Sequence, residues 1–269
     1  MRGVKVIAVL LVVCLCFCGC SARKNLKDLS VAEGLGIDNA EQGKRVTVQT
    51  LNLAKAGNGT AALSGNVTLN TAGTGRNISS AAAAAAESLS KDLFFGQNKL
   101  LVFSMDVAVN DLATCFDYLM RSENSRPDVP VCISSGTAAQ LLDCGQNDAL
   151  VPAQAVAELL KNGQNSGFSL YVSVNEMLNL YKDKTSDICL PVITAGDESS
   201  RTSGIAIFSE SRLAGVLSGD ETVGLLFLKD KVKSGYMELE SEKYGNIGVR
   251  IIGASSKTKA FAQLSLIHI

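Results

Sequence analysis

The chain has 269 residues, with 25 Lys and Arg against 26 Asp and Glu and a formal net charge of −1. This balance excludes the basic surface that a nucleic-acid-binding protein carries, and a hydrophobic fraction of 46% excludes a disordered chain. The single histidine, His268, is the residue before the last. Because histidine is the usual base in nucleophilic catalysis and a common metal ligand, the composition argues against a His-dependent enzyme or zinc site.

The N-terminus has the pattern of an export signal. Arg2 and Lys5 precede the uncharged apolar run Val6–Cys18, which is shorter than the roughly 20 residues that a membrane-spanning helix needs. The run ends in Gly19 and Cys20, a small residue before a cysteine, and polar residues follow. This ending resembles the lipobox of bacterial lipoproteins, which implies a signal peptide at residues 1–19 and diacylglycerol on the Cys20 thiol. The alternative is an ordinary cleaved signal whose apolar core is rich in cysteine.

The next part of the chain is predicted to be a polar tether followed by β structure. Residues 21–32 are polar, and the segment around Val46 and Val48 alternates apolar with polar side chains, which is typical of a half-buried strand. Loose alternation further on predicts a weak hairpin, and Gly73 and Gly75 are expected to mark a turn. The predicted strands here are 34–37, 45–51 and the hairpin at 63–69.

Helices are predicted where a capping residue precedes an apolar periodicity. Ser79 and Ser80 are expected to cap an alanine-rich helix, which is smooth enough to pack closely against a sheet. After Asp111 the apolar residues follow the spacing of an amphipathic helix, and Pro152 suits a first helical turn. The predicted helices are 81–89, 112–120, 138–142, 152–161, 174–181 and 221–227.

Later strands are predicted from short apolar runs. Residues 100–103 are continuously apolar, as in a strand buried on both faces. The run at 129–133 contains Pro130, which predicts a strand near a sheet edge. A change of pattern after Gly196 indicates a second unit that opens with a hairpin. Its predicted strands are 205–208, 213–217, 236–239 and 247–252.

The order of these elements predicts an α+β fold of mixed α/β layers. The expected organisation is a signal peptide at 1–19, an N-terminal mixed-sheet domain at 20–198 and the start of a C-terminal α/β domain at 199–269.

The sequence shows no catalytic constellation. It lacks a P-loop, a G-x-S-x-G elbow and an H-E-x-x-H motif, and the glycine pair at 73–75 is a weak candidate for an anion cradle. Acidic pairs such as Glu238 and Glu240 lie in a polar run that predicts a solvated face. We therefore expect no catalytic, cofactor-binding or metal-binding residue.

Four downstream cysteines contain no C-x-x-C pair, which argues against zinc. Two of them, Cys115 and Cys132, lie in apolar patterns and are interpreted as buried free thiols. Disulfides stay open as an alternative for the whole set: Cys115, Cys132, Cys144 and Cys189.

Several stretches, taken in order beside the lipobox, resemble the Ger(x)C family, the lipoprotein C subunits of spore germinant receptors. Where the family usually has a histidine, this chain has Gln97, and the family's Cys-Trp-Asp start is here Cys20-Ser21-Ala22. The similar stretches are Val31–Asp38, Leu93–Val102, Arg121–Arg126, Ser135–Ala138, Gly204–Phe208, Arg212–Leu217 and Glu221–Leu225.

The resemblance implies a non-enzymatic subunit, anchored through Cys20 to the outer face of the spore inner membrane. It also implies two membrane-embedded partners, the A-type and B-type receptor subunits. Family members are longer, so the C-terminal domain is expected to be truncated, and whether residues 262–269 are native stays open. The alternative is a lipid-anchored solute-binding or other envelope protein unrelated to sporulation. A third class is an envelope hydrolase that uses carboxylates.

Overall fold

The computed structural model describes residues 28–52, 67–121, 126–144, 149–183, 186–197 and 199–257, together with Gly3. The signal peptide at 1–19, the lipidation site Cys20 and the tail at 262–269 lie outside the described residues. These assignments therefore stay predictions.

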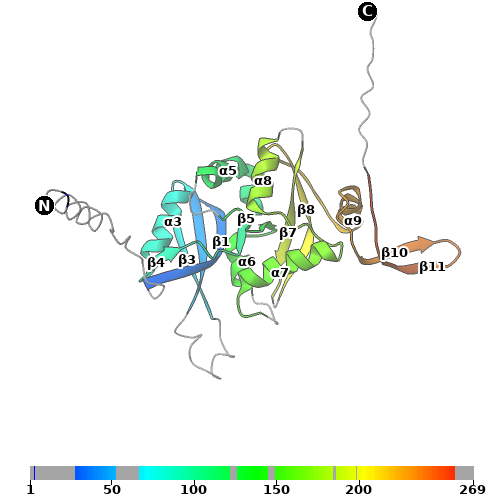
Figure 1. Cartoon of the computed structure of the whole chain (residues 1–269), viewed down its shortest axis with the longest axis horizontal. Helices are drawn as coiled ribbons and strands as arrows, with labels where there is room; N and C mark the ends of the chain where they lie inside the picture. The colour runs from blue at the N-terminus through cyan, green and yellow to red at the C-terminus, as the bar shows by residue number, and fades with distance from the viewer. Residues whose placement is uncertain are drawn as a thin grey trace, which may run out of the picture.

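The described strands form one nine-stranded sheet and one separate hairpin (Figure 1). The main path runs β3-β2-β1-β5-β6-β7-β8-β9, and the short β4 pairs with the start of β1. The four central strands, β1, β5, β6 and β7, are parallel, and antiparallel strands flank them on both sides. The mixed α+β fold is thereby confirmed. The strands are β1 Leu29–Ala40, β2 Gly43–Leu51, β3 Thr68–Gly75, β4 Asp92–Phe94, β5 Leu100–Ser104, β6 Val131–Ser134, β7 Ile188–Ala195, β8 Ser200–Ser209 and β9 Arg212–Leu217.

Helices cover both faces of this sheet, which explains the continuous apolar run of β5. Leu101 and Phe103 belong to a core cluster shared with α3, α5 and α8, while Leu100 and Val102 pack with α6 and α7 on the other face. A strand buried on both faces needs an apolar side chain at every position. The helices are α3 Ile78–Glu87, α4 Met105–Asn110, α5 Leu112–Arg121, α6 Ala138–Asp143, α7 Pro152–Asn165, α8 Val174–Lys182 and α9 Gly219–Leu228.

A two-stranded hairpin follows α9 and projects from one end of the molecule (Figure 1). It consists of β10 (Gly235–Ser241) and β11 (Gly245–Ile251). Met237 pairs with Val249 and Leu239 with Ile247, so one face of the hairpin is apolar. The domain boundary predicted at residue 198 falls between β7 and β8, which pair antiparallel in the main sheet.

Two local predictions at the start of the chain are wrong. The strand β1 begins at Leu29, inside the segment predicted to be a tether. The N-cap of α3 is Asn77, whose side chain accepts from the Ser80 backbone N–H at 2.9 Å, while the Ser80 hydroxyl accepts from the Asn77 N–H. A reciprocal capping box joins the N-cap residue to the residue three positions later. With Asn77 as the N-cap, Ser79 and Ser80 lie inside the helix.

Two predictions about glycine and proline are also wrong. Gly73 and Gly75 lie in β3, in register with β2, and mark no turn. The strand after Pro130 is central, with β5 on one side and β7 on the other. Pro130 itself lies just before β6, in an isolated bridge to Ser173, so the ladder of β6 loses no donor.

Candidate functional site

The usual ligand position of an open parallel sheet is filled here by a side chain of the protein. Ligands of such sheets bind beyond the carboxyl ends of the strands, often at a helix N-terminus. At this edge the buried Asp38 of β1 accepts from the backbone N–H groups of Ala138, at 2.7 Å, and Ala139, at 3.2 Å. The first N–H groups of α6 are therefore satisfied internally. Burial raises the pKa of Asp38, and these two hydrogen bonds and Arg45 oppose that rise.

We predict that Asp38→Asn changes how stability depends on pH. Folding raises the pKa of Asp38 above its ordinary value of 3.8. At pH values between the pKa of the unfolded chain and that of the folded chain, Asp38 is therefore protonated in the folded chain and ionised in the unfolded chain. The free energy of unfolding therefore falls as pH rises through that interval and is flat above it. Asn has no such titration. Urea unfolding at a series of pH values is the measurement. As the pH is lowered from neutral, the free energy of unfolding of the wild type should rise relative to that of the variant. Parallel pH profiles would contradict this.

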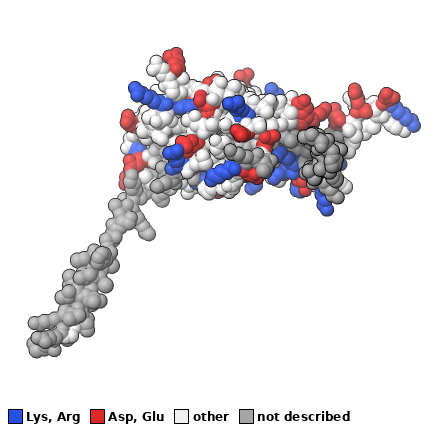
Figure 2. Space-filling view, turned by 90° about the horizontal axis from the view of Figure 1, so that it is seen from above, with Lys and Arg blue, Asp and Glu red and all other residues white. Residues whose placement is uncertain are grey.

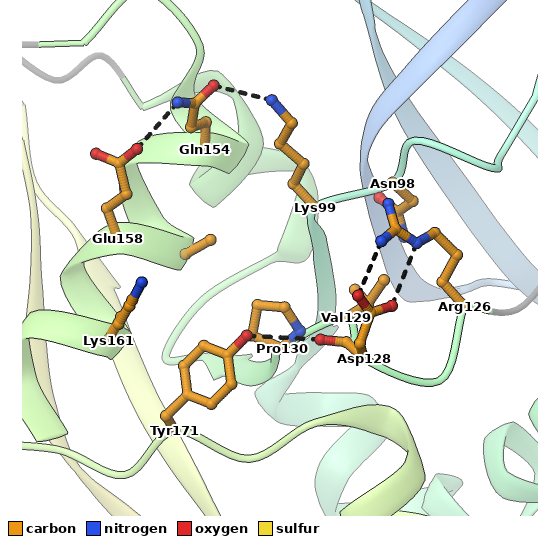
Figure 3. Close-up of a pocket in the computed structure, with 11 residues that line it drawn as sticks. Asn98, Lys99, Arg126, Asp128, Val129, Pro130, Gln154, Glu158, Lys161 and Tyr171 are labelled. Atoms are coloured by element: carbon orange, nitrogen blue, oxygen red, sulfur yellow. Dashed lines mark hydrogen bonds and ion pairs between the residues drawn. The ribbon is translucent and has the colours of Figure 1, made fainter.

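A polar hollow lies at the opposite edge of the parallel strands and is the candidate site. Its volume is about 340 Å³, which is at the lower end of the roughly 300–1,000 Å³ of ligand pockets. Residues before β5 and β6 form one wall, α7 forms another, and Tyr171 lies at the lower edge of the hollow in the view of Figure 3. We call it the Asn98 hollow. Its lining residues are Asn98, Lys99, Arg126, Asp128, Val129, Pro130, Gln154, Ala157, Glu158, Lys161 and Tyr171.

An ion pair and two hydrogen bonds connect β1, the residue before β5 and α7 along the upper side of the hollow. The Lys99 ammonium lies 3.3 Å from a carboxylate oxygen of the buried Glu33 and donates to Gln154 Oε1 at 3.1 Å. Gln154 in turn donates to Glu158 Oε1 at 2.9 Å. Lys99 and Gln154 are therefore held by the protein itself.

Arg126 fixes the loop before β6, which forms part of the wall opposite α7. Its Nη2 and Nε donate to the two carboxylate oxygens of Asp128 at 2.8 and 3.2 Å, and its Nη1 donates to the Gly96 carbonyl at 3.3 Å. The Tyr171 hydroxyl donates to the Asp128 carbonyl at 3.5 Å. Burial raises the pKa of Tyr171, and the Asp128 charge adds to the rise. Tyr171 is therefore a neutral hydrogen-bonding group.

Two polar groups of the hollow have no protein partner among the described residues. Asn98 is buried, and its Oδ1 accepts no hydrogen bond. The Lys161 ammonium forms no ion pair or hydrogen bond with the described residues, whereas the charged groups of Lys99 and Arg126 both do. The Asn98 Oδ1 is itself closed to solvent, so of these two groups only the Lys161 ammonium is open to a ligand.

Two further properties of the described residues concern metal ligands and membrane spans. It holds no group of three or more His, Cys, Asp or Glu side chains placed for a metal ion. None of its helices is both long enough and apolar enough to span a bilayer. Lysines and arginines are interspersed with acidic side chains on the face shown in Figure 2.

The structure places the predicted thiols in the core. Cys115 and Cys132 are free and buried, as predicted, and Cys144 and Cys189 are buried as well, with the Cys144 thiol donating to the Gly196 carbonyl at 3.2 Å. Burial raises the pKa of Cys115 to about 12 and that of Cys132 further. Thiols with such pKa values are poor nucleophiles at neutral pH.

The residues of the Asn98 hollow were not singled out by the sequence. Asn98 and Lys99 stand out only as the residues before a buried strand and as part of the stretch Leu93–Val102 that resembles the Ger(x)C family, and Arg126 only as the end of another such stretch. Gln97, where that family usually has histidine, is exposed and does not line the hollow.

The molecule is thus a mixed-sheet α+β protein with a small polar hollow. A family model described as "Spore germination protein N-terminal domain" matches residues 22–195, and one described as "Spore germination B3/ GerAC like, C-terminal" matches residues 203–264. The first match alone covers more than half of the chain. The chain therefore belongs to the GerAC-like spore germination family, and the predicted family is confirmed.

Two individual proteins are similar to the chain. YfkR of Bacillus subtilis (strain 168), named for spore germination, is 23% identical over 235 residues, which is 83% of this chain and 60% of YfkR. The chain thus spans about three fifths of that relative. The crystal structure of the GerBC protein matches with 16% identity and a TM-score of 0.48, over 89% of this chain and 69% of that one.

Proposed function

We propose that the chain is the non-catalytic, lipid-anchored C-type subunit of a nutrient germinant receptor, on the outer face of the spore inner membrane. The observation that carries the proposal is the order of the two family matches, which together reach from residue 22 to residue 264. The first of them begins two residues after Cys20, where the sequence predicts the lipid. The partners would be the two membrane-embedded subunits, of A and B type.

The position of Cys20 relative to the sheet gives the anchor a physical role. Cys20 precedes Leu29, the first residue of β1, by nine residues. An extended chain of that length spans roughly 30 Å. A diacylglycerol at Cys20 would therefore hold the main sheet close to the bilayer. Tethering of this kind raises the effective concentration of the domain for partners in the same membrane.

We predict that Cys20→Ala releases the protein from membranes. The acyl chains supply the affinity, at about 0.8 kcal/mol for each buried methylene, and the substitution removes the thiol that accepts them. Cys18→Ala is the matched control, because it removes a neighbouring thiol and should leave the protein in the membrane fraction. Fractionation of sporulating cells in high salt is the measurement. Complete retention of Cys20→Ala in the membrane would disprove the anchor.

The receptor role is tested by affinity capture from detergent-solubilised spore inner membrane. Two polytopic membrane proteins should be recovered together with the tagged chain. Recovery of the chain without them, from spores that contain the receptor, would favour the solute-binding alternative.

A further inference from the structure

We propose that the outer edge of β3 binds an extended, uncharged segment of another protein, which pairs with β3 as one more strand of the main sheet. This goes beyond the proposed receptor role, because it assigns a contact surface to the subunit. β3 is the last strand on one side of the main sheet, and β2 is its neighbour. The outer edge of such a strand presents N–H and C=O groups with which another chain can pair.

The register of β2 and β3 identifies the backbone groups at this edge. The Asn52 N–H donates to the Val67 carbonyl at 2.7 Å, one position beyond the first pair of the ladder. Along an antiparallel ladder, hydrogen-bonded pairs alternate with pairs whose N–H and C=O groups point away from each other. Every second residue of β3, counted from the residue after Val67, therefore turns both groups outward. These residues are Thr68, Asn70, Ala72 and Thr74. Each is exposed or half-buried, and their backbone groups form no hydrogen bond with the described residues.

The β3 strand lacks the features that usually prevent such pairing. Natural edge strands carry charges, a proline or a bulge. The eight residues of β3 include no charged residue and no proline, and their register with β2 is unbroken. At the other end of the sheet, β9 begins with Arg212 and pairs with β8 in an irregular register. The contrast identifies β3 as the edge that accepts an added strand.

The surface beside this edge determines the side chains of the partner. Gly73 lies under α3, and Leu69 is on the same face of the strand because side chains alternate. Leu69 is 48% exposed, and the middle of α3 is the alanine run Ala81–Ala86. This neutral, apolar surface suits aliphatic side chains at every second position of the added strand.

A second copy of the chain does not fit this edge. The helix α3 lies directly over β3, because a Cβ on Gly73 or Gly75 would touch the helix backbone. Antiparallel pairing of two β3 strands would place the two α3 helices on one face of the joined sheet, separated by about the 5 Å between neighbouring strands. Packed helices need about 8–10 Å. The added strand must therefore have no helix above it, as in an extended segment.

The experiment is an NMR titration of the purified full chain with a capped peptide of four alternating valine–threonine pairs, flanked by one lysine at each end. Saturable shifts are expected at the backbone amides of the four outward residues of β3. The control probe is the same peptide with proline in place of two valines, which removes donors and disfavours a strand. It should bind at least about tenfold more weakly.

Ala72→Pro should weaken binding of the valine–threonine peptide at least about tenfold. It removes one outward N–H and places a ring against the added strand, whereas the ladder with β2 loses no donor. Ala72→Thr is the matched control, because it keeps the N–H and suits a strand, and it should leave binding unchanged. Spectra without peptide will verify that both variants fold, and the proline probe tests the wild type independently of them.

Four outcomes would overturn the proposal. The first three are the absence of saturable shifts at β3, equal binding of the two peptides by the wild type, and equal binding by the two folded variants. The fourth is a wild-type dimer in sedimentation that Ala72→Pro makes monomeric, which would assign the edge to a second copy. None of them bears on membrane anchoring or partner capture, which test the proposed function separately.

Discussion

Gly73→Ala should lower the free energy of unfolding by about 3 kcal/mol, at the upper end of the usual cost of overpacking. Gly73 lies where β3 passes directly against α3. A Cβ there would overlap the Ala85 nitrogen and the Ala81 carbonyl oxygen, and it would lie 2.6 Å from the Ala84 carbonyl carbon. All three are backbone atoms of the helix, so no side chain can rotate away. The strand or the helix must move.

The matched control is Gly215→Ala in β9, where an added Cβ meets no atom within 4 Å. Thermal unfolding measures both. A cost of about 3 kcal/mol corresponds to a fall in Tm of roughly 6–12 °C for a chain of this size, and the control should stay near the wild type. Equal Tm values for the two variants would show that the contact between β3 and α3 relaxes freely.

The same contact shows what local sequence could and could not predict. An alanine-rich helix packed closely on a sheet was expected, and α3 on β3 confirms it. The glycines of the facing strand were interpreted as a turn, because Gly most often supplies conformational freedom. Here glycine is needed at position 73 because it has no side chain. That role depends on a helix that arrives later in the chain, and nothing local reveals it.

Two errors in the centre of the sheet involve strands with a proline in or beside them. No strand was predicted at β7, whose apolar run contains Pro191. In the structure β7 pairs with β6 only at Val192 and Ile193, beyond the proline, so the missing N–H costs that ladder nothing. The strand β6 was predicted near an edge because of Pro130, which in fact precedes it. In both cases the outcome depends on register, which is set by distant residues.

The candidate site was beyond local prediction for the same reason. The Asn98 hollow joins residues near positions 98, 126, 158 and 171, which share no motif. Only the pairing of parallel strands across long connections brings them together. By contrast, the amphipathic helix α5 and the buried strand β5 depend on local periodicity, and both were predicted within a residue or two.

Gln49→Leu should destabilise the protein by about 3 kcal/mol, because Gln49 satisfies backbone groups at the ends of two helices. It lies fully buried in β2. Its Oε1 accepts from the Ala153 N–H in the first turn of α7 at 2.9 Å, and its Nε2 donates to the Leu142 carbonyl in the last turn of α6. The N-cap of α7, Val151, offers no side-chain acceptor.

Leucine has a similar size but no polar atoms, so it leaves these groups buried without their partner. An orphaned buried donor or acceptor costs about 1–3 kcal/mol. The Leu142 carbonyl keeps Asn70 Nδ2 as a donor, at 3.2 Å, whereas Asn70 Oδ1 loses the 3.0 Å hydrogen bond that Gln49 donates. The loss should therefore be concentrated at the Ala153 N–H and at Asn70.

Urea unfolding and hydrogen exchange measure these effects together. Gln97→Leu, at an exposed glutamine, is the matched control and should change stability by no more than about 0.5 kcal/mol. In Gln49→Leu the Ala153 amide should exchange faster than the amides in the middle of α7, because the first turn loses its acceptor before the helix unfolds. If Gln49→Leu were as stable as the wild type, apolar packing would outweigh the hydrogen bonds at this position. The helix ends would then be held by their contacts with the sheet.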